Sequence, residues 1–140
     1  MTTAAVAGAV AFGWLGMVAG VSFLEAPLKF RAPGITLALG LGIGRIVFRA
    51  LNRVELALLA VLVTATALGP VDPARLVLTA VLGTVLAVQL LGVRPRLNRR
   101  ADRVLAGEDV PRSAEHHAYV ALEVVKVVLL VATGIAAFAG

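Results

Sequence analysis

The sequence contains no cysteine, few aromatic residues and few charged ones. Without cysteine, disulfides, thiolate metal sites and cysteine nucleophiles are excluded. Aromatic residues make up 5% of the chain, which argues against the stacking surfaces that bind single-stranded nucleic acid. Only 15% of the residues are charged, whereas 60% are hydrophobic. This composition is too apolar for an ordinary soluble domain, and we expect one integral membrane domain, residues 1–140.

The positive charge, a net +5, is concentrated in two segments of the chain. Residues 29–53 hold five of the 13 Lys and Arg residues, and residues 94–112 hold six. Because both segments adjoin apolar stretches, we expect them to contact anionic lipid headgroups. No nucleic-acid partner is predicted. Positive charge collects in cytoplasmic loops, so both segments are predicted to be cytoplasmic. The arginines expected at the headgroups are Arg45, Arg49, Arg53, Arg99 and Arg100.

Four apolar stretches are predicted to cross the membrane, at about residues 3–24, 54–68, 75–93 and 117–139. The expected fold is therefore all-α, a four-transmembrane-helix bundle in the cytoplasmic membrane. With both basic segments cytoplasmic, both termini and the turn at 69–74 are expected outside. Ser113 is expected to cap the fourth span.

The segment after the first span is predicted to break and then form an interfacial helix. Two prolines in residues 25–34 oppose a continuous helix. In residues 35–52, arginines four positions apart share one face beside apolar surface, which is typical of an amphipathic helix lying at the membrane interface. A helix unbroken from 35 to 69 would be roughly 50 Å long, more than the bilayer core, so a bend is expected near Asn52.

Residues 94–115 are predicted to form a basic cytoplasmic segment. It includes a short amphipathic helix that ends at Gly107.

Small residues in the first span indicate close packing. Gly16 and Gly20 have the GxxxG spacing that lets another helix approach. We expect that helix to belong to the same chain, with a dimer seam as the alternative.

The start of the fourth span, EHHAYVALEVVKVV, carries a polar stripe. At 100° per residue, His116, Tyr119, Glu123 and Lys126 fall on one side of the helix, whereas His117 does not. Ionisable groups inside a membrane are costly and are therefore functional candidates. A structural role, a path for a solute, ion or proton, and catalysis all remain open for this stripe.

This stripe is expected to belong to a larger polar cluster in the cytoplasmic third of the bundle. The cluster predicted for binding consists of Glu25, Arg45, Asn52, Glu55, His116, Tyr119, Glu123 and Lys126. No catalytic residue, metal or cofactor is predicted. Adjacent histidines diverge on a helix, and the run GLGIGR lacks the GxGxxG spacing of a dinucleotide site.

Three stretches of the chain carry a family resemblance. SFLEAPLKF, GRIVFRALNRVE and RPRLNRRADRVLAGE, the last leading to HHAYVALEVVK, resemble the small four-span family of transmembrane-protein-205-like and related bacterial membrane proteins. The resemblance covers most of the chain. It implies a topology more than an activity.

A second resemblance lies in RALNRVE, residues 49–55. It is similar to the Arg, Asn and Glu pattern that opens the second span in membrane-associated eicosanoid and glutathione enzymes, which are trimers of four-span chains. That resemblance implies glutathione binding by Arg49, Asn52 and Glu55, with Tyr119 activating the thiol. The Arg-to-Asn spacing is one residue shorter here, and the long basic segment 94–115 is out of place.

The favoured function is non-enzymatic, either a small transporter-like or channel-like protein or an accessory scaffold in the cytoplasmic membrane. The alternative is a trimeric, membrane-bound, glutathione-dependent enzyme. A chain of 14.4 kDa has few walls for a pathway of its own. We therefore expect a homo-oligomer, a dimer or a trimer.

Overall fold

The computed structural model describes residues 2–112 and 114–139, and all regular structure in these residues is helical. The helices join into four long rods. The first rod is α1, the π-helical segment η1, α2 and the 3₁₀ segment η2; the second is α3; the third is α4, the π-helical segment η3 and α5; the fourth is α6. The bounds are α1 Thr3–Val18, η1 Ala19–Glu25, α2 Ala26–Leu28, η2 Lys29–Arg31, α3 Leu37–Leu68, α4 Pro73–Val88, η3 Gln89–Val93, α5 Arg94–Leu105 and α6 Ala114–Phe138.

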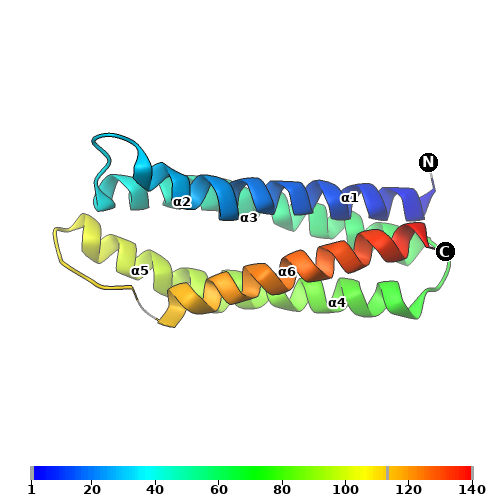
Figure 1. Ribbon diagram of the computed structural model, residues 1–140. Helices are drawn as coiled ribbons and strands as arrows, with labels where there is room; N and C mark the ends of the chain where they lie inside the picture. Colours follow the sequence, from blue (N-terminus) through cyan, green and yellow to red (C-terminus); the bar gives the residue numbers. More distant parts are fainter. Residues whose placement is uncertain (1, 113, 140) are drawn as a thin grey trace.

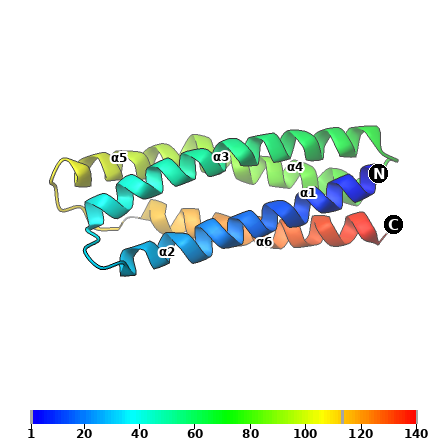
Figure 2. The ribbon, with the colours of Figure 1, turned by 90° about the horizontal axis from the view of Figure 1, so that it is seen from above.

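The four rods lie side by side as an elongated bundle (Figure 1, Figure 2). Both chain ends and the turn between α3 and α4 lie at one end, which we call the terminal end. The loop between η2 and α3 lies at the other end, with α5 and the loop that follows it; we call this the basic end. The two basic segments therefore share one end of the molecule.

The outside of the bundle is apolar. In the described part of the chain, three helices are long and apolar enough to cross a membrane, namely Thr3–Arg31, Pro73–Leu105 and Ala114–Phe138. Large hydrophobic side chains are exposed on all four rods, among them Phe12, Leu56, Val81 and Val128. Such a surface is unfavourable in water but suits the hydrocarbon core of a membrane, which is itself apolar.

The centre of the bundle holds a small hydrophobic core. Trp14 of α1, Leu62 of α3, Leu82 and Leu86 of α4 and Leu130 of α6 are almost fully buried against one another. The single tryptophan thus lies where the rods meet. The core fixes the rotation of each rod, and thereby decides which polar side chains face inward.

The bend predicted near Asn52 is wrong, because α3 is one continuous helix of 32 residues, about 48 Å long. Of the segment predicted as a separate interfacial helix, 35–52, residues 37–52 form the first half of α3. Thr36 caps that half by accepting a hydrogen bond from the amide of Leu39. The half packs on α5, where the side chain of Arg45 donates to the carbonyl oxygen of Asn98. Because α5 of the same chain covers this side, the segment does not need to lie flat on the membrane surface.

The break predicted for residues 25–34 is shorter than expected. The first rod stays helical to Arg31, with Pro27 just after the π-helical segment η1. The chain turns at Gly34, whose φ of 79° suits glycine. The amphipathic helix predicted after residue 94 is present as α5, and the chain leaves it at Gly107, with a φ of 93°. The cap predicted at Ser113 lies outside the described residues.

The close packing predicted at Gly16 and Gly20 is also wrong for the single chain. A Cβ atom added at either glycine would meet nothing within 4 Å. Both therefore border open space rather than another helix of the same chain.

Candidate functional site

The inward face of α6 carries three of the four residues predicted to share a stripe. The side chains of Tyr119, Glu123 and Lys126 are buried in the bundle. His116 lies at the start of α6, half-exposed, with its ring 5.6 Å from that of His117. Only the part of the stripe from Tyr119 onward is therefore buried in the bundle.

Lys126 lies between two carboxyl groups. Its Nζ is 2.5 Å from Oε2 of Glu55 on α3 and 2.6 Å from Oε1 of Glu123 on α6. Two neutral donors complete the arrangement: Trp14 Nε1 donates to Glu55 Oε2 at 2.8 Å, and Gln89 Nε2 donates to Glu123 Oε1 at 2.7 Å. We call these five residues the ionic network. Each rod contributes to it, so the network joins all four.

The ionic network is unbalanced in charge and in hydrogen bonds. All five side chains are at most 2% exposed. Two carboxyl groups face one ammonium group, so the network carries one net negative charge unless one carboxyl group is protonated. Three buried acceptor atoms have no partner among the described residues, namely Glu55 Oε1, Glu123 Oε2 and Gln89 Oε1. Buried acceptors without donors, and a buried charge without a counter-charge, are energetically costly.

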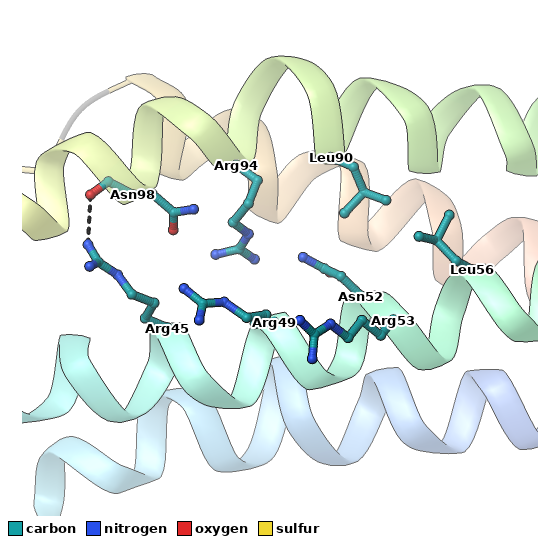
Figure 3. Close-up of a pocket in the computed structure, with 8 residues that line it drawn as sticks. All are labelled: Arg45, Arg49, Asn52, Arg53, Leu56, Leu90, Arg94 and Asn98. Carbon is teal, nitrogen blue, oxygen red and sulfur yellow. Dashed lines mark hydrogen bonds between the residues drawn. The ribbon is translucent and has the colours of Figure 1, made fainter.

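A second polar site lies nearer the basic end, between α3 and the third rod (Figure 3). It is a cavity of about 180 Å³, which we call the arginine pocket. The lining residues are Arg45, Arg49, Asn52, Arg53, Leu56, Leu90, Arg94 and Asn98. No acidic residue is among them.

The arginines of the pocket differ in their partners. Arg45 pairs with Asp102 at 2.6 Å and also donates to the carbonyl oxygen of Asn98 at 2.9 Å. Arg49, Arg53 and Arg94 form no ion pair with any described residue. Three guanidinium groups on the pocket wall are therefore without a counter-charge.

Arg94 is held in place by two aromatic rings. Its guanidinium carbon lies 4.5 Å from the ring centre of Phe48 and 4.3 Å from that of Tyr119. Such cation–π contacts hold an arginine in place without neutralising its charge. The Nε and Nη2 atoms of Arg94 are buried and have no hydrogen-bond partner among the described residues.

The π-helical segment η3 connects the two sites. Gln89 of the ionic network begins it, and Arg94 follows its last residue, with the amide of Arg94 donating to the carbonyl oxygen of Gln89. This i to i+5 bond brings Gln89 and Arg94 onto neighbouring positions of one helix face. In an unbroken α-helix they would be about 140° apart.

The single polar cluster predicted from the sequence is in fact divided. Glu55, Glu123 and Lys126 meet in the ionic network, whereas Arg45 and Asn52 line the arginine pocket. Glu25 lies elsewhere, 3.6 Å from the ammonium group of Lys29. These partners lie along different stretches of the rods, which residue spacing alone does not reveal.

The residues named for glutathione are divided in the same way. Arg49 and Asn52 line the pocket, but Glu55 faces the core and accepts hydrogen bonds there. Tyr119 is not among the residues that line the pocket, but its ring contacts Arg94, which is.

The arginines predicted at lipid headgroups have three kinds of surroundings. Arg45, Arg49 and Arg53 line the pocket. Arg100 donates to the carbonyl oxygens of Val110 and Pro111, so it also secures the loop after α5. Arg99 is exposed.

Four polar or aromatic residues that complete these sites were not predicted from the sequence, namely Trp14, Gln89, Arg94 and Asn98. Trp14, Gln89 and Arg94 carry no spacing signal that links them to the others. Asn98, on α5, was assigned only to a basic helix. Among the described residues, no group of three or more His, Asp and Glu side chains could hold a metal ion.

Comparison with known proteins gave no match: no protein-family model matches the chain, and no curated protein and no solved structure is significantly similar to it. The two family resemblances therefore stay predictions.

Proposed function

We propose that this chain is a multi-pass protein of the cytoplasmic membrane in which all four rods cross the lipid, with the basic end in the cytoplasm. The apolar exterior and the three apolar helices support a membrane location. Measured along the helices from the terminal end, the ionic network lies roughly 17–24 Å deep. A hydrocarbon core of about 30 Å would therefore enclose it.

Within that frame the protein is transporter-like, and the ionic network is the place where it binds and releases a proton. The observation that supports this most is the sharing of one ammonium group, Lys126, by two buried carboxyl groups, Glu55 and Glu123. A structural ion pair needs only one carboxyl group. The second leaves acceptors unsatisfied, and ionisable groups at this depth are costly unless they serve a function.

The single tryptophan provides the test, because Trp14 donates to Glu55 and its fluorescence depends on that charge. In detergent or in liposomes, its emission is expected to shift with pH in a single transition. The variant Glu55→Gln should lose the transition, because its amide cannot ionise. Glu108→Gln removes an exposed carboxyl group that pairs with Arg103 near the surface, and should leave the transition unchanged.

A second measurement addresses transport. Liposomes containing the protein and a trapped pH-sensitive dye should pass protons faster than empty liposomes, and Glu55→Gln should slow that flux. A Trp14 transition without any flux would leave an accessory scaffold as the better description. If the Trp14 emission is constant from pH 4 to pH 9, the network is a fixed structural tie and the proposal is wrong.

The glutathione-dependent enzyme remains the second candidate, because Arg49 and Asn52 do line one pocket. Saturable binding of glutathione that Arg49→Ala abolishes would favour it. The inward position of Glu55 favours the transporter-like protein instead.

A further inference from the structure

We propose that the arginine pocket is a binding site for a phosphate group. This inference rests on residues other than those of the ionic network, so it does not depend on proton uptake there. The ligand chemistry is that of a phosphate ester or free phosphate, carried either by an anionic lipid headgroup or by a soluble molecule.

The first argument is charge. Four arginines line the cavity, and among the residues that the structure describes only Arg45 has a carboxylate partner, Asp102. Like charges gathered without neutralisation repel one another, and a bound anion would relieve that repulsion. Neutral ligands offer no such relief.

The second argument is the orientation of Arg94. Its guanidinium carbon lies within 4.5 Å of the ring centres of both Phe48 and Tyr119, and these two cation–π contacts hold the group in place. Its buried Nε and Nη2 atoms have no partner among the described residues. Buried donors are almost always satisfied in folded proteins, so this pair indicates a missing acceptor. Two adjacent donors of one guanidinium group match two oxygens of a phosphate.

The third argument is convergence. In the close-up view, the guanidinium groups of Arg49 and Arg94 extend from opposite walls into the same space, with Asn52 between α3 and the third rod (Figure 3). Donors from two rods can thus surround one anion. The cavity of about 180 Å³ is smaller than the roughly 300–1,000 Å³ of pockets for drug-sized ligands. A single phosphate group fits this size better than a tripeptide.

The fourth argument is position. Measured from the terminal end, Arg49 and Arg94 lie roughly 29 and 32 Å along their helices, at the inner edge of a hydrocarbon core of about 30 Å. Leu56 and Leu90 form the wall on the side nearer the core. A cationic rim above an apolar wall is the boundary at which lipid phosphates lie, and it is also open to soluble phosphate from the cytoplasm.

The experiment uses the full chain in detergent, with two probes. Inorganic phosphate is added while the thermal midpoint is followed, and native mass spectrometry records lipids retained after purification from mixed phosphatidylglycerol and phosphatidylcholine. We expect at least one probe to bind, as a rise in the midpoint with phosphate or as selective retention of phosphatidylglycerol. The first outcome assigns the site to soluble phosphates and the second to lipid headgroups.

Variants separate the pocket from general positive charge. Arg49→Gln and Arg94→Gln should each weaken binding by about tenfold or more, since each removes charge-assisted hydrogen bonds. Arg99→Gln removes the same charge from an exposed position outside the pocket and should change binding less than about twofold. Because Arg49 is exposed on its helix, its substitution keeps the test valid even if Arg94→Gln fails to fold.

Three results would overturn the proposal. The wild-type protein could bind neither probe, the three variants could weaken binding equally, or glutathione could bind the pocket while phosphate and phosphatidylglycerol do not. The last result would favour the glutathione-dependent enzyme.

Discussion

At the scale of single residues, Lys126 determines whether two carboxyl groups can be buried in the centre of the bundle. It lies fully buried between Glu55 and Glu123, within 2.6 Å of both. Removing a carboxyl group brings the network closer to neutrality, whereas removing the ammonium group leaves two buried negative charges that repel each other. The energetic cost of the two changes is therefore expected to differ in size.

We predict that Lys126→Met lowers the free energy of unfolding by about 3–5 kcal/mol, the usual cost of removing one partner from a buried ion pair. Glu55→Gln should cost clearly less. The double variant Glu55→Gln, Lys126→Met should be more stable than Lys126→Met alone, because it buries one uncompensated charge instead of two. Equilibrium unfolding of the detergent-solubilised protein, followed by far-ultraviolet circular dichroism, measures all three.

The matched control is Arg103→Met, since Arg103 pairs with Glu108 at 2.6 Å and both side chains are more than half exposed. That substitution should change stability by less than about 1 kcal/mol. A Lys126→Met protein as stable as the wild type would show that the pairing of Lys126 with the two carboxyl groups does not stabilise the fold.

At the scale of helical elements, η3 matters most, because it sets how the third rod presents Gln89 and Arg94. Its i to i+5 bond behaves as one extra residue inserted into an α-helix. Deleting that residue should restore an ordinary α-helix without rotating the flanking helices α4 and α5. Leu91 is the residue to delete, since its side chain lies within η3 and is 81% exposed.

We predict that deletion of Leu91 leaves a folded protein whose thermal midpoint stays close to that of the wild type. Deletion of Val81, an exposed residue in the middle of α4, should prevent folding. That deletion rotates every later position of the rod by about 100°, turning Leu82 and Leu86 away from the core. Fluorescence-detected size-exclusion chromatography of the two proteins distinguishes these outcomes. If both deletions fold equally well, the third rod is not locked in register by the core.

The helices were predicted better from the sequence than the way in which they connect and bend. The inward side of α6 followed from helical spacing, because Tyr119, Glu123 and Lys126 lie in one regular helix. The relation between Gln89 and Arg94 did not follow, because a π-helical segment changes the angle between residues and has no reliable sequence signal. The straight course of α3 was missed for another reason. Its basic half was predicted to lie on the membrane surface, whereas it packs on α5. That contact joins residues some fifty positions apart, which a local sequence pattern does not reveal.

The candidate site was predicted only in part. Of the residues expected to form one polar cluster, Glu55, Glu123 and Lys126 do meet. Arg45 and Asn52 lie farther along the rods and line the arginine pocket instead. Trp14 could not be assigned, since an indole in an apolar helix is usually a packing residue.

At the scale of the whole molecule, the two ends of the bundle differ in charge. Arg75 lies near the terminal end, paired with Asp72, whereas the two basic segments lie at the basic end. In a membrane this difference orients the protein, because positive segments are retained in the cytoplasm. The same orientation would place the arginine pocket at the inner leaflet, where anionic lipids are found.

The absence of native cysteine allows a direct test of that orientation. Val71, in the turn between α3 and α4, is 86% exposed, and Arg99 is exposed on α5. A membrane-impermeant maleimide applied to intact cells should label Val71→Cys and leave Arg99→Cys unlabelled. In inside-out vesicles the pattern should reverse, and detergent should make both sites reactive. The wild-type chain, which has no thiol, is the blank. Labelling of both sites in intact cells would mean that the chain does not span the membrane as four rods. Labelling of Arg99→Cys alone would mean that the basic end faces outward, against the charge difference between the two ends.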